Sequence, residues 1–361
     1  MLNIVHDNLP LSNVWFAPKI PNHIGFSLQH NKPLPSFLHI HNDLTFHSSA
    51  DGLDSFIYPI VMADSYIQVR SLIMNHNPFG FWAHVSDSVI KGLREKRGWI
   101  IIDICSEPIT NHDFDNVLNA LSDSSLFPND RVLLNTASPD FVDNIRVFDH
   151  PSWLEMGCYI TEFQNGFRPC YCHQENIKRL DPYPHKRLLL LNNHIDYTAA
   201  RLFANYASKF PDSFLDSSDT IPGKNDLLLP NALYATDLNV VLEAYTDSDT
   251  IEYAFMTEKI FRNIKYKKPF VVVGQQHTLS AFRKLGYKTF HTLFDESYDT
   301  YNNTRQRCTE VMKLLEWLRL LSDDTWGGLL ANCQPILDHN YDNLMSRINQ
   351  TNAWLENLKN L

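Results

Sequence analysis

Glu258, Lys259 and Arg262 form a charged group whose place in the chain suits the binding of an anion. They follow an apolar run at 238–244, whose length and valine content predict a buried strand. A helical pattern begins at Thr257, which is a good N-cap, with Glu258 beside the positive end of the helix. A helix start that follows a strand of an open parallel sheet is a place where anionic ligands bind. The sequence therefore predicts an anion site at this helix.

The elements around the charged group predict an alternating order of strand, helix, strand and helix. The apolar residues of the first helix share one face at helical spacing: Ile260, Phe261 and Ile264. The three charged residues are therefore expected on the opposite face, clear of the core. Pro269 ends this helix, and 270–273 reads as a second buried parallel strand that ends at Gly274. Thr278 can cap the next helix, which Gly286 ends.

This stretch resembles the donor-binding motif of fucosyltransferase-like glycosyltransferases. The resemblance is carried by TEKIF at 257–261, by the apolar segment into Pro269 and by the strand FVVVG at 270–274. The continuation, LGYKTF at 285–290 and DESYD at 295–299, is similar to a branch common in bacteriophages and large viruses. Together these motifs indicate a sugar-nucleotide site in the second half of the chain.

The resemblance implies an α/β fold of two facing Rossmann-like domains, the GT-B type. We expect an acceptor-side domain at 1–180, a nucleotide-sugar domain at 181–340 and a last helix at 341–361 that can pack back on the first domain. The implied activity is inverting transfer of a sugar from a nucleoside-diphosphate sugar to a hydroxyl acceptor. The acceptor is left open between a glycan, a protein and a hydroxymethylated DNA base. The alternative is a non-catalytic nucleotide-sugar-binding protein or a virion structural protein that keeps the fold.

The resemblance also implies which residues bind the donor. Lys259 and Arg201 would stabilise the negative charge that grows on the departing diphosphate, with Arg as a bidentate partner and Lys as a point charge. Glu258 would accept hydrogen bonds from ribose or sugar hydroxyls. Spacing alone favours a surface pair of Glu258 and Arg262 worth about 0.3–0.5 kcal/mol, and the matched downstream motifs favour the donor role. The full predicted donor set is Asn192, Arg201, Glu243, Thr257, Glu258, Lys259, Arg262 and Gly274.

Transfer also needs a base that takes the proton of the acceptor hydroxyl. Glu107 is the first choice, because it follows a clear apolar strand at 99–105 in the first half of the chain. His41 and Asp43 are further catalytic candidates, with Asp103 and His84 as weaker ones.

No metal and no cofactor besides the donor substrate are expected, because cationic side chains can replace Mg²⁺ at a diphosphate. Two clusters nevertheless contain metal-ligand residue types. His39, His41 and Asp43 could form a metal site on a strand, or could be ordinary surface or core histidines. Four residues between 158 and 173 could hold zinc or be free cysteines and a histidine, since their spacing is not that of a standard finger. They are Cys158, Cys170, Cys172 and His173.

Composition and patterning agree with a two-domain α/β protein of 361 residues. In the first half, a helix at 86–97, the strand at 99–105, a helix at 113–121 and a strand at 131–134 repeat the α/β order. The formal charge of −10 disfavours a protein that coats nucleic acid nonspecifically. No apolar run reaches the roughly 18 residues that span a bilayer, and the first residues lack the basic and apolar sections of a signal peptide, so a cytoplasmic protein is expected.

Overall fold

The computed structural model divides the chain into two compact units, each built on a parallel sheet. The first unit comprises Met1–Cys170 and Asn349–Leu361, and the second comprises Tyr171–Ile348. The structure describes residues 2–5, 44–61, 86–103, 131–136, 146–149, 185–191, 198–216, 233–243, 246, 254–256 and 258–358. The predicted helix at 113–121 lies outside these residues. Both sheets are parallel and are accompanied by helices, so the predicted α/β class is confirmed for the described residues.

The sheet of the first unit has six parallel strands in the order β2-β1-β3-β4-β5-β6. The strands are β1 (Leu2–Val5), β2 (Leu44–His47), β3 (Phe56–Val61), β4 (Gly98–Asp103), β5 (Val132–Thr136) and β6 (Arg146–Asp149). Helix α5 (Asp87–Arg94) precedes β4. The strands predicted at 99–105 and 131–134 correspond to β4 and β5, and the helix predicted at 86–97 corresponds to α5.

A phenylalanine ring fixes the join between α5 and its sheet. Phe56, at the start of β3, is paired with Gly98 at the start of β4. A Cβ atom added at Gly98 or at Gly92 of α5 would overlap the Phe56 ring. Both glycines therefore make room for one buried aromatic side chain, which is 2% exposed.

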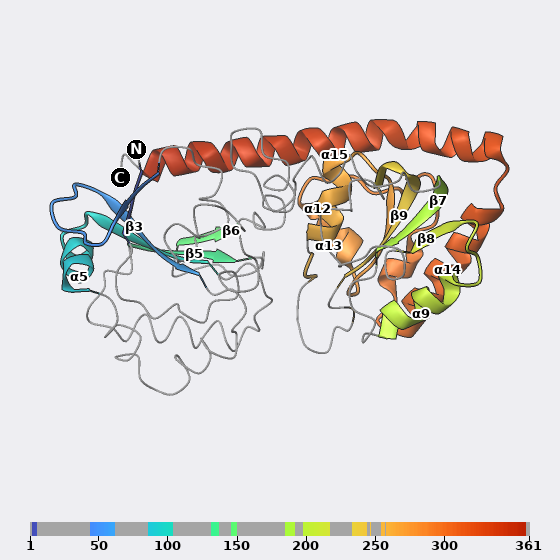
Figure 1. The fold of residues 1–361 in the computed structure, drawn as a ribbon, viewed down its shortest axis with the longest axis horizontal. Helices are drawn as coiled ribbons and strands as arrows, with labels where there is room; N and C mark the ends of the chain where they lie inside the picture. Colours follow the sequence, from blue (N-terminus) through green and yellow to red (C-terminus); the bar gives the residue numbers. More distant parts are fainter. Residues whose placement is uncertain are drawn as a thin grey trace, which may run out of the picture. The chain divides into compact units, whose positions relative to one another are not determined.

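The sheet of the second unit has four parallel strands in the order β10-β9-β7-β8. The strands are β7 (Lys186–Leu191), β8 (Phe214–Asp216), β9 (Thr236–Leu242) and β10 (Phe270–Val273). The helices are α9 (Thr198–Ala207), α12 (Glu258–Lys265), α13 (Thr278–Lys284), the 3₁₀ helix η3 (Ser297–Thr300), α14 (Thr304–Leu320) and α15 (Asp323–Leu358) (Figure 1). The predicted strands at 238–244 and 270–273 are confirmed as β9 and β10.

Two predicted helix boundaries differ from the structure. The last helix, expected from 341, begins at Asp323 and runs through Pro335 for 36 residues. Thr278 does not cap α13, because its hydroxyl donates instead to the carbonyl of Gln275, at 2.8 Å. The carboxylate of Asp299 accepts the helix-start N–H groups of Leu279 and Ser280. Of the described helices, none is both long and apolar enough to cross a membrane.

Candidate functional site

The strand order of the second unit contains a topological switch point, at which a crevice is expected at the carboxyl ends of the strands. From β7 the chain passes through α9 to β8 on one side, and from β9 it passes through α12 to β10 on the other side. Right-handed crossovers in opposite directions place the two helices on opposite faces of the sheet, and Figure 1 shows α9 and α12 on either side of it. The switch point therefore lies between the carboxyl ends of β7 and β9, where open α/β sheets bind ligands.

Glu243 and Lys259 meet at this edge. Glu243 directly follows β9, and its backbone N–H donates to the carbonyl of Val273 on β10, at 2.9 Å. The Lys259 Nζ lies 3.9 Å from the Glu243 Oε2. The Glu243 side chain is fully buried, and the Lys259 side chain is only 12% exposed. The structure thus brings together two of the predicted donor residues, one at a strand end and one in the first turn of the next helix.

Arg201 lies on the other helix that borders the switch point. It is in the first turn of α9, which follows β7, and its side chain is exposed to solvent. Arg201 and Lys259 therefore come from the first turns of the two helices that flank one crevice. This placement follows from topology, and the structure records no contact between these two side chains.

Arg262 is buried, contrary to the predicted solvent-facing position. It is 8% exposed, and it belongs to a run of five consecutive buried residues, 260–264. The aromatic side chain of Phe261 contacts Phe282 of α13 and Tyr287, with ring centroids 6.4 and 5.8 Å apart. Because α12 is covered on more than the sheet side, it has no open polar face at these positions. The expectation that the charged face is clear of the core is wrong for Arg262.

Gly274 is required by the turn between β10 and α13. A Cβ atom at this position would lie 2.5 Å from the Thr278 hydroxyl, so any other residue would force the Thr278 side chain to shift. Its carbonyl accepts a hydrogen bond from the Nε of Arg307, at 3.1 Å.

Arg307 supports the edge of the site and was not predicted. Its guanidinium is 1% exposed and donates to the carbonyls of Gly274, Tyr301, Asn302 and Thr246. These contacts hold the loops that follow β9 and β10. A signal was present in the sequence, because position 307 falls on the buried stripe of α14 that includes Thr304, Val311 and Leu314.

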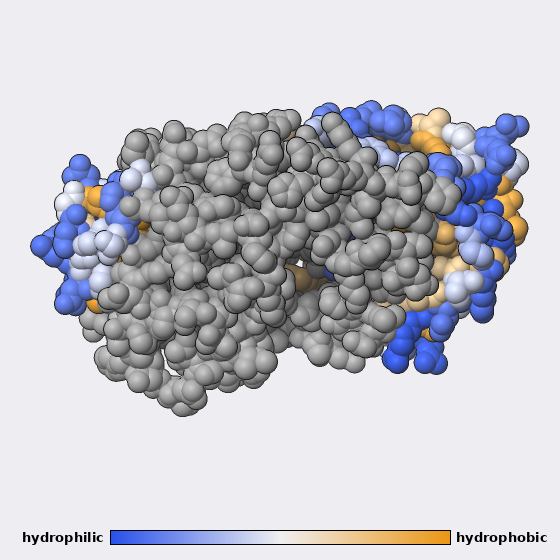
Figure 2. Space-filling view, in the orientation of Figure 1, coloured by the Kyte–Doolittle hydropathy of each residue, from blue (hydrophilic) through white to orange (hydrophobic). Residues whose placement is uncertain are grey.

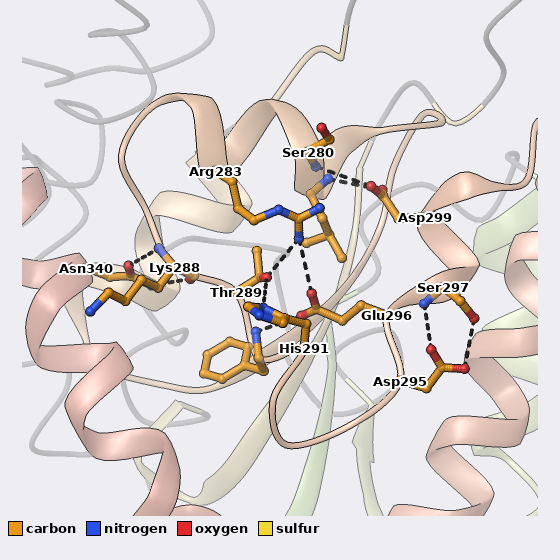
Figure 3. A network of polar contacts seen from close by, with 12 residues as sticks. Ser280, Arg283, Lys288, Thr289, His291, Asp295, Glu296, Ser297, Asp299 and Asn340 are labelled. Carbon is orange, nitrogen blue, oxygen red and sulfur yellow. Dashed lines mark hydrogen bonds and ion pairs between the residues drawn. The ribbon is translucent and has the colours of Figure 1, made fainter.

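The motifs LGYKTF and DESYD form a structural network in the second unit (Figure 3). Glu296 accepts from the backbone N–H of Phe290, at 2.7 Å, and lies 3.4 Å from Arg283. Asn340 of α15 donates to the carbonyl of Lys288 and accepts from its N–H, at 2.9 and 2.7 Å. These side chains bond to one another and to the backbone, so the contacts account for these motifs as a support of the fold.

Several predicted residues fall outside the described part of the structure. The catalytic candidates Glu107, His41, Asp43 and His84 lie there, and so do the donor candidates Asn192 and Thr257 and the cluster of Cys158, Cys170, Cys172 and His173. Glu258 begins α12, and its side chain is not described. Asp103 ends β4.

Two further features bear on ligand binding. Within the described residues, no group of three or more His, Cys, Asp or Glu side chains could hold a metal ion.

A surface groove of about 380 Å³ lies between the 293–298 segment and α14, and Trp317 forms part of its wall. None of the predicted donor residues lines this groove, so it is distinct from the switch-point crevice.

No protein-family model and no curated protein matches the sequence. The fold is similar to solved structures at 11% sequence identity. One is an alpha1,3-fucosyltransferase, aligned over 99% of this chain and 89% of that chain with a TM-score of 0.44. Another is an alpha1,3-fucosyltransferase with GDP-fucose, over 97% and 90% with a TM-score of 0.43. A third is T4 phage BGT in complex with UDP and Mn²⁺, over 99% of both chains with a TM-score of 0.40.

Proposed function

We propose that this protein is a glycosyltransferase that moves a sugar from a nucleoside-diphosphate sugar to a hydroxyl group. The observation that carries the proposal is the place of Lys259. The lysine of the TEKIF motif stands in the first turn of α12, beside the end of β9 and next to the switch point of the sheet. A cation at that edge, with the N–H groups of the helix start, matches the charge of a diphosphate.

The burial of Lys259 strengthens its action on a leaving group. Charges interact more strongly where water is excluded, and a fixed cation needs no reorganisation when negative charge develops. Glu243 supplies the opposite charge at 3.9 Å, which is longer than a direct hydrogen bond. A diphosphate carries more negative charge than one carboxylate, so it can compete with Glu243 for the ammonium group. We propose that Glu243 holds Lys259 in place between turnovers.

The remaining roles complete the proposed reaction. Arg201 contacts the diphosphate from α9, and Glu258 accepts hydrogen bonds from hydroxyls of the donor. Glu107 acts as the base, so that attack of the acceptor oxygen on the anomeric carbon inverts its configuration while the diphosphate leaves with the bonding electrons. The cationic side chains take the place of a metal ion. The acceptor is a glycan, a protein or a hydroxymethylated DNA base.

A screen of nucleoside-diphosphate sugars tests this proposal. The screen measures thermal stabilisation of the protein and hydrolysis or transfer of the sugar, and it is run with and without EDTA to test for a metal ion. A ligand at 100 times its dissociation constant adds about 2.7 kcal/mol to the free energy of unfolding. We expect Lys259→Ala to lower turnover about 10²–10³-fold, the range for loss of one group that stabilises transition-state charge. Lys284→Ala removes an exposed lysine of α13 and should leave turnover unchanged.

The same screen separates catalysis from binding alone. Glu107→Gln should lower turnover while leaving the donor dissociation constant unchanged, because a base acts on the acceptor. Stabilisation by a nucleotide sugar without any turnover would favour the non-catalytic alternative. Wild-type turnover in Lys259→Ala would remove this residue from the site and the proposal with it, and loss of turnover in EDTA would contradict the metal-free mechanism.

A further inference from the structure

A buried chain of polar groups joins β9 to the first turn of α12. The Thr236 hydroxyl lies 3.5 Å from the Asn239 Oδ1, the Asn239 Nδ2 donates to the Asn263 Oδ1, and the Asn263 Nδ2 donates to the Lys259 carbonyl at 2.7 Å. Thr236, Asn239 and Asn263 are each 0% exposed. The chain therefore ends on the backbone of the residue that carries the proposed phosphate-binding ammonium group.

The presence of Asn239 and Asn263 calls for an explanation, because the interface between β9 and α12 around them is apolar. Val241 of β9, which lies on the same side of the sheet as Asn239, and Ile260 and Ile264 of α12 are all almost fully buried. An unpaired buried amide is costly, whereas apolar side chains would pack there without that risk. Apolar contacts tolerate small shifts of one element along another, but a chain of hydrogen bonds is satisfied in a single register. The two amides thus set how α12 is placed on the sheet.

The same two elements are joined again at the site. Asn239 and Glu243 are four residues apart along the strand direction, so their side chains point to the same side of the sheet. Asn263 and Lys259 are four residues apart on α12 and lie on one face of it. The contact between Asn239 and Asn263 and the contact between Glu243 and Lys259 therefore form two successive links between one strand and one helix.

We infer that Asn239 and Asn263 are positioning residues for Lys259. They hold the first turn of α12 in register with β9, so that the ammonium group stays beside Glu243 at the switch-point crevice. Neither asparagine contacts the proposed ligand site directly, and the assignment rests on the proposed function for its effect on a ligand.

The position of Lys259 can be measured without a ligand. In the full chain, the ¹H–¹³C NMR signal of the Lys259 ε-methylene group is identified as the lysine signal that disappears in Lys259→Arg. We expect Asn263→Ala and Asn239→Ala to shift this signal. Asn340→Ala is the matched control, because Asn340 is also 0% exposed and makes two backbone hydrogen bonds, but at α15. An unchanged Lys259 signal in both variants, or an equal shift in Asn340→Ala, would overturn the inference.

A double-mutant cycle measures the effect on binding. The dissociation constants of UDP and GDP are determined by calorimetry for the wild type, Asn263→Ala, Lys259→Ala and the double variant. We expect Asn263→Ala to weaken binding about tenfold in the wild type and less than about twofold in the Lys259→Ala background. Equal losses in both backgrounds would show a general structural role and refute the assignment. Asn239→Ser replaces Asn263→Ala if that variant does not fold. A wild type that binds neither UDP nor GDP, nor any other nucleoside diphosphate in the same assay, contradicts the proposed function, while the NMR result still decides the inference.

Discussion

Glu296 shows how the second unit uses a charged side chain inside its fold. Its carboxylate is 6% exposed, accepts the Phe290 N–H and faces Arg283 across 3.4 Å. Burial raises the pKa of Glu296, and this outweighs the hydrogen bonds from Thr289 and Phe290 and the charge of Arg283, which lower it. The partly exposed guanidinium therefore compensates only part of the cost of removing the carboxylate from water.

This raised pKa predicts how stability changes with pH. A carboxyl that binds its proton more tightly in the folded protein stabilises the fold fully below its ordinary pKa of 4.5, and this contribution is lost as pH rises through the folded pKa. The difference in the free energy of unfolding between wild type and Glu296→Gln should therefore fall as pH rises from about 4 to about 7. Urea denaturation of both proteins at the two pH values measures it.

A control is available in the same segment. Asp295→Asn removes one exposed negative charge without touching the contact with Arg283. A wild-type advantage over Glu296→Gln that stays constant or grows with pH would show that burial does not govern this carboxyl.

At the residue scale, the position of a charged side chain after a strand could be predicted from the sequence, but its burial could not. Lys259 was predicted from its place after a strand, and the structure puts it at the sheet edge beside Glu243. Arg262 and Arg307 were not recognised as buried, because arginine is rarely buried unless it is paired. The Asn239–Asn263 link joins positions 24 residues apart, and neither residue alone reveals a partner.

At the scale of elements, the central parallel strands were the most predictable feature. β10 is a continuous apolar run that is buried along its whole length, and β9 is buried from Leu238 to Leu242 with Asn239 as its polar residue there, so periodicity is not needed to find these strands. The solvent-facing side of α12 was predicted wrongly, since amphipathic spacing assumes a helix with one open face. The early start of α15 was missed because Gly327, Gly328 and Pro335 all argue locally against a helix.

Substitution of alanine for Gly286 and for Gly327 is predicted to change the stability of the fold in opposite directions. Gly286 follows α13 with a φ of +86°, and a Cβ atom there would lie 3.4 Å from the Asn343 amide. Gly286→Ala should therefore destabilise the fold by about 1 kcal/mol or more, because alanine is strained at positive φ. Gly327 lies within α15 with nothing within 4 Å of an added Cβ. Gly327→Ala should stabilise by up to about 1 kcal/mol through helix propensity.

Urea denaturation with far-UV circular dichroism checks both glycine variants under the same conditions. Each substitution adds the same methyl group, so a difference in sign reflects mainly the backbone conformation at the two positions. Equal effects of the two substitutions would argue against the left-handed turn at Gly286.

At the scale of the whole molecule, each unit contains one reversal of strand order. The reversal lies between β1 and β3 in the first sheet and between β7 and β9 in the second. The residues at the second switch point could be placed from the sequence because they follow recognisable strands and helix starts, and their role in donor binding stays a prediction. The facing arrangement of the two domains remains a prediction, and so does the role of Glu107 as base, because Glu107 lies outside the described residues.

The surface and charge of the chain bear on the open choice of acceptor. The described surface in Figure 2 is mostly hydrophilic with scattered hydrophobic residues, as on ordinary globular proteins. Acidic residues outnumber Lys and Arg by 41 to 31, which gives the formal charge of −10. Nonspecific binding to DNA comes from phosphates neutralised by Lys and Arg, so a chain of this charge should bind duplex DNA poorly.

Fluorescence anisotropy with a duplex of about 20 base pairs, with and without a hydroxymethylated base, tests this at about 50 mM and about 200 mM salt. We expect no saturable binding of either duplex at the higher salt, which would favour a glycan or protein acceptor. Binding of both duplexes that weakens about 10³-fold between the two salt concentrations would reveal a local cluster of cations despite the net charge. Tighter binding of the modified duplex alone would identify the base hydroxyl as the acceptor, because the phosphate contacts of the two duplexes are the same.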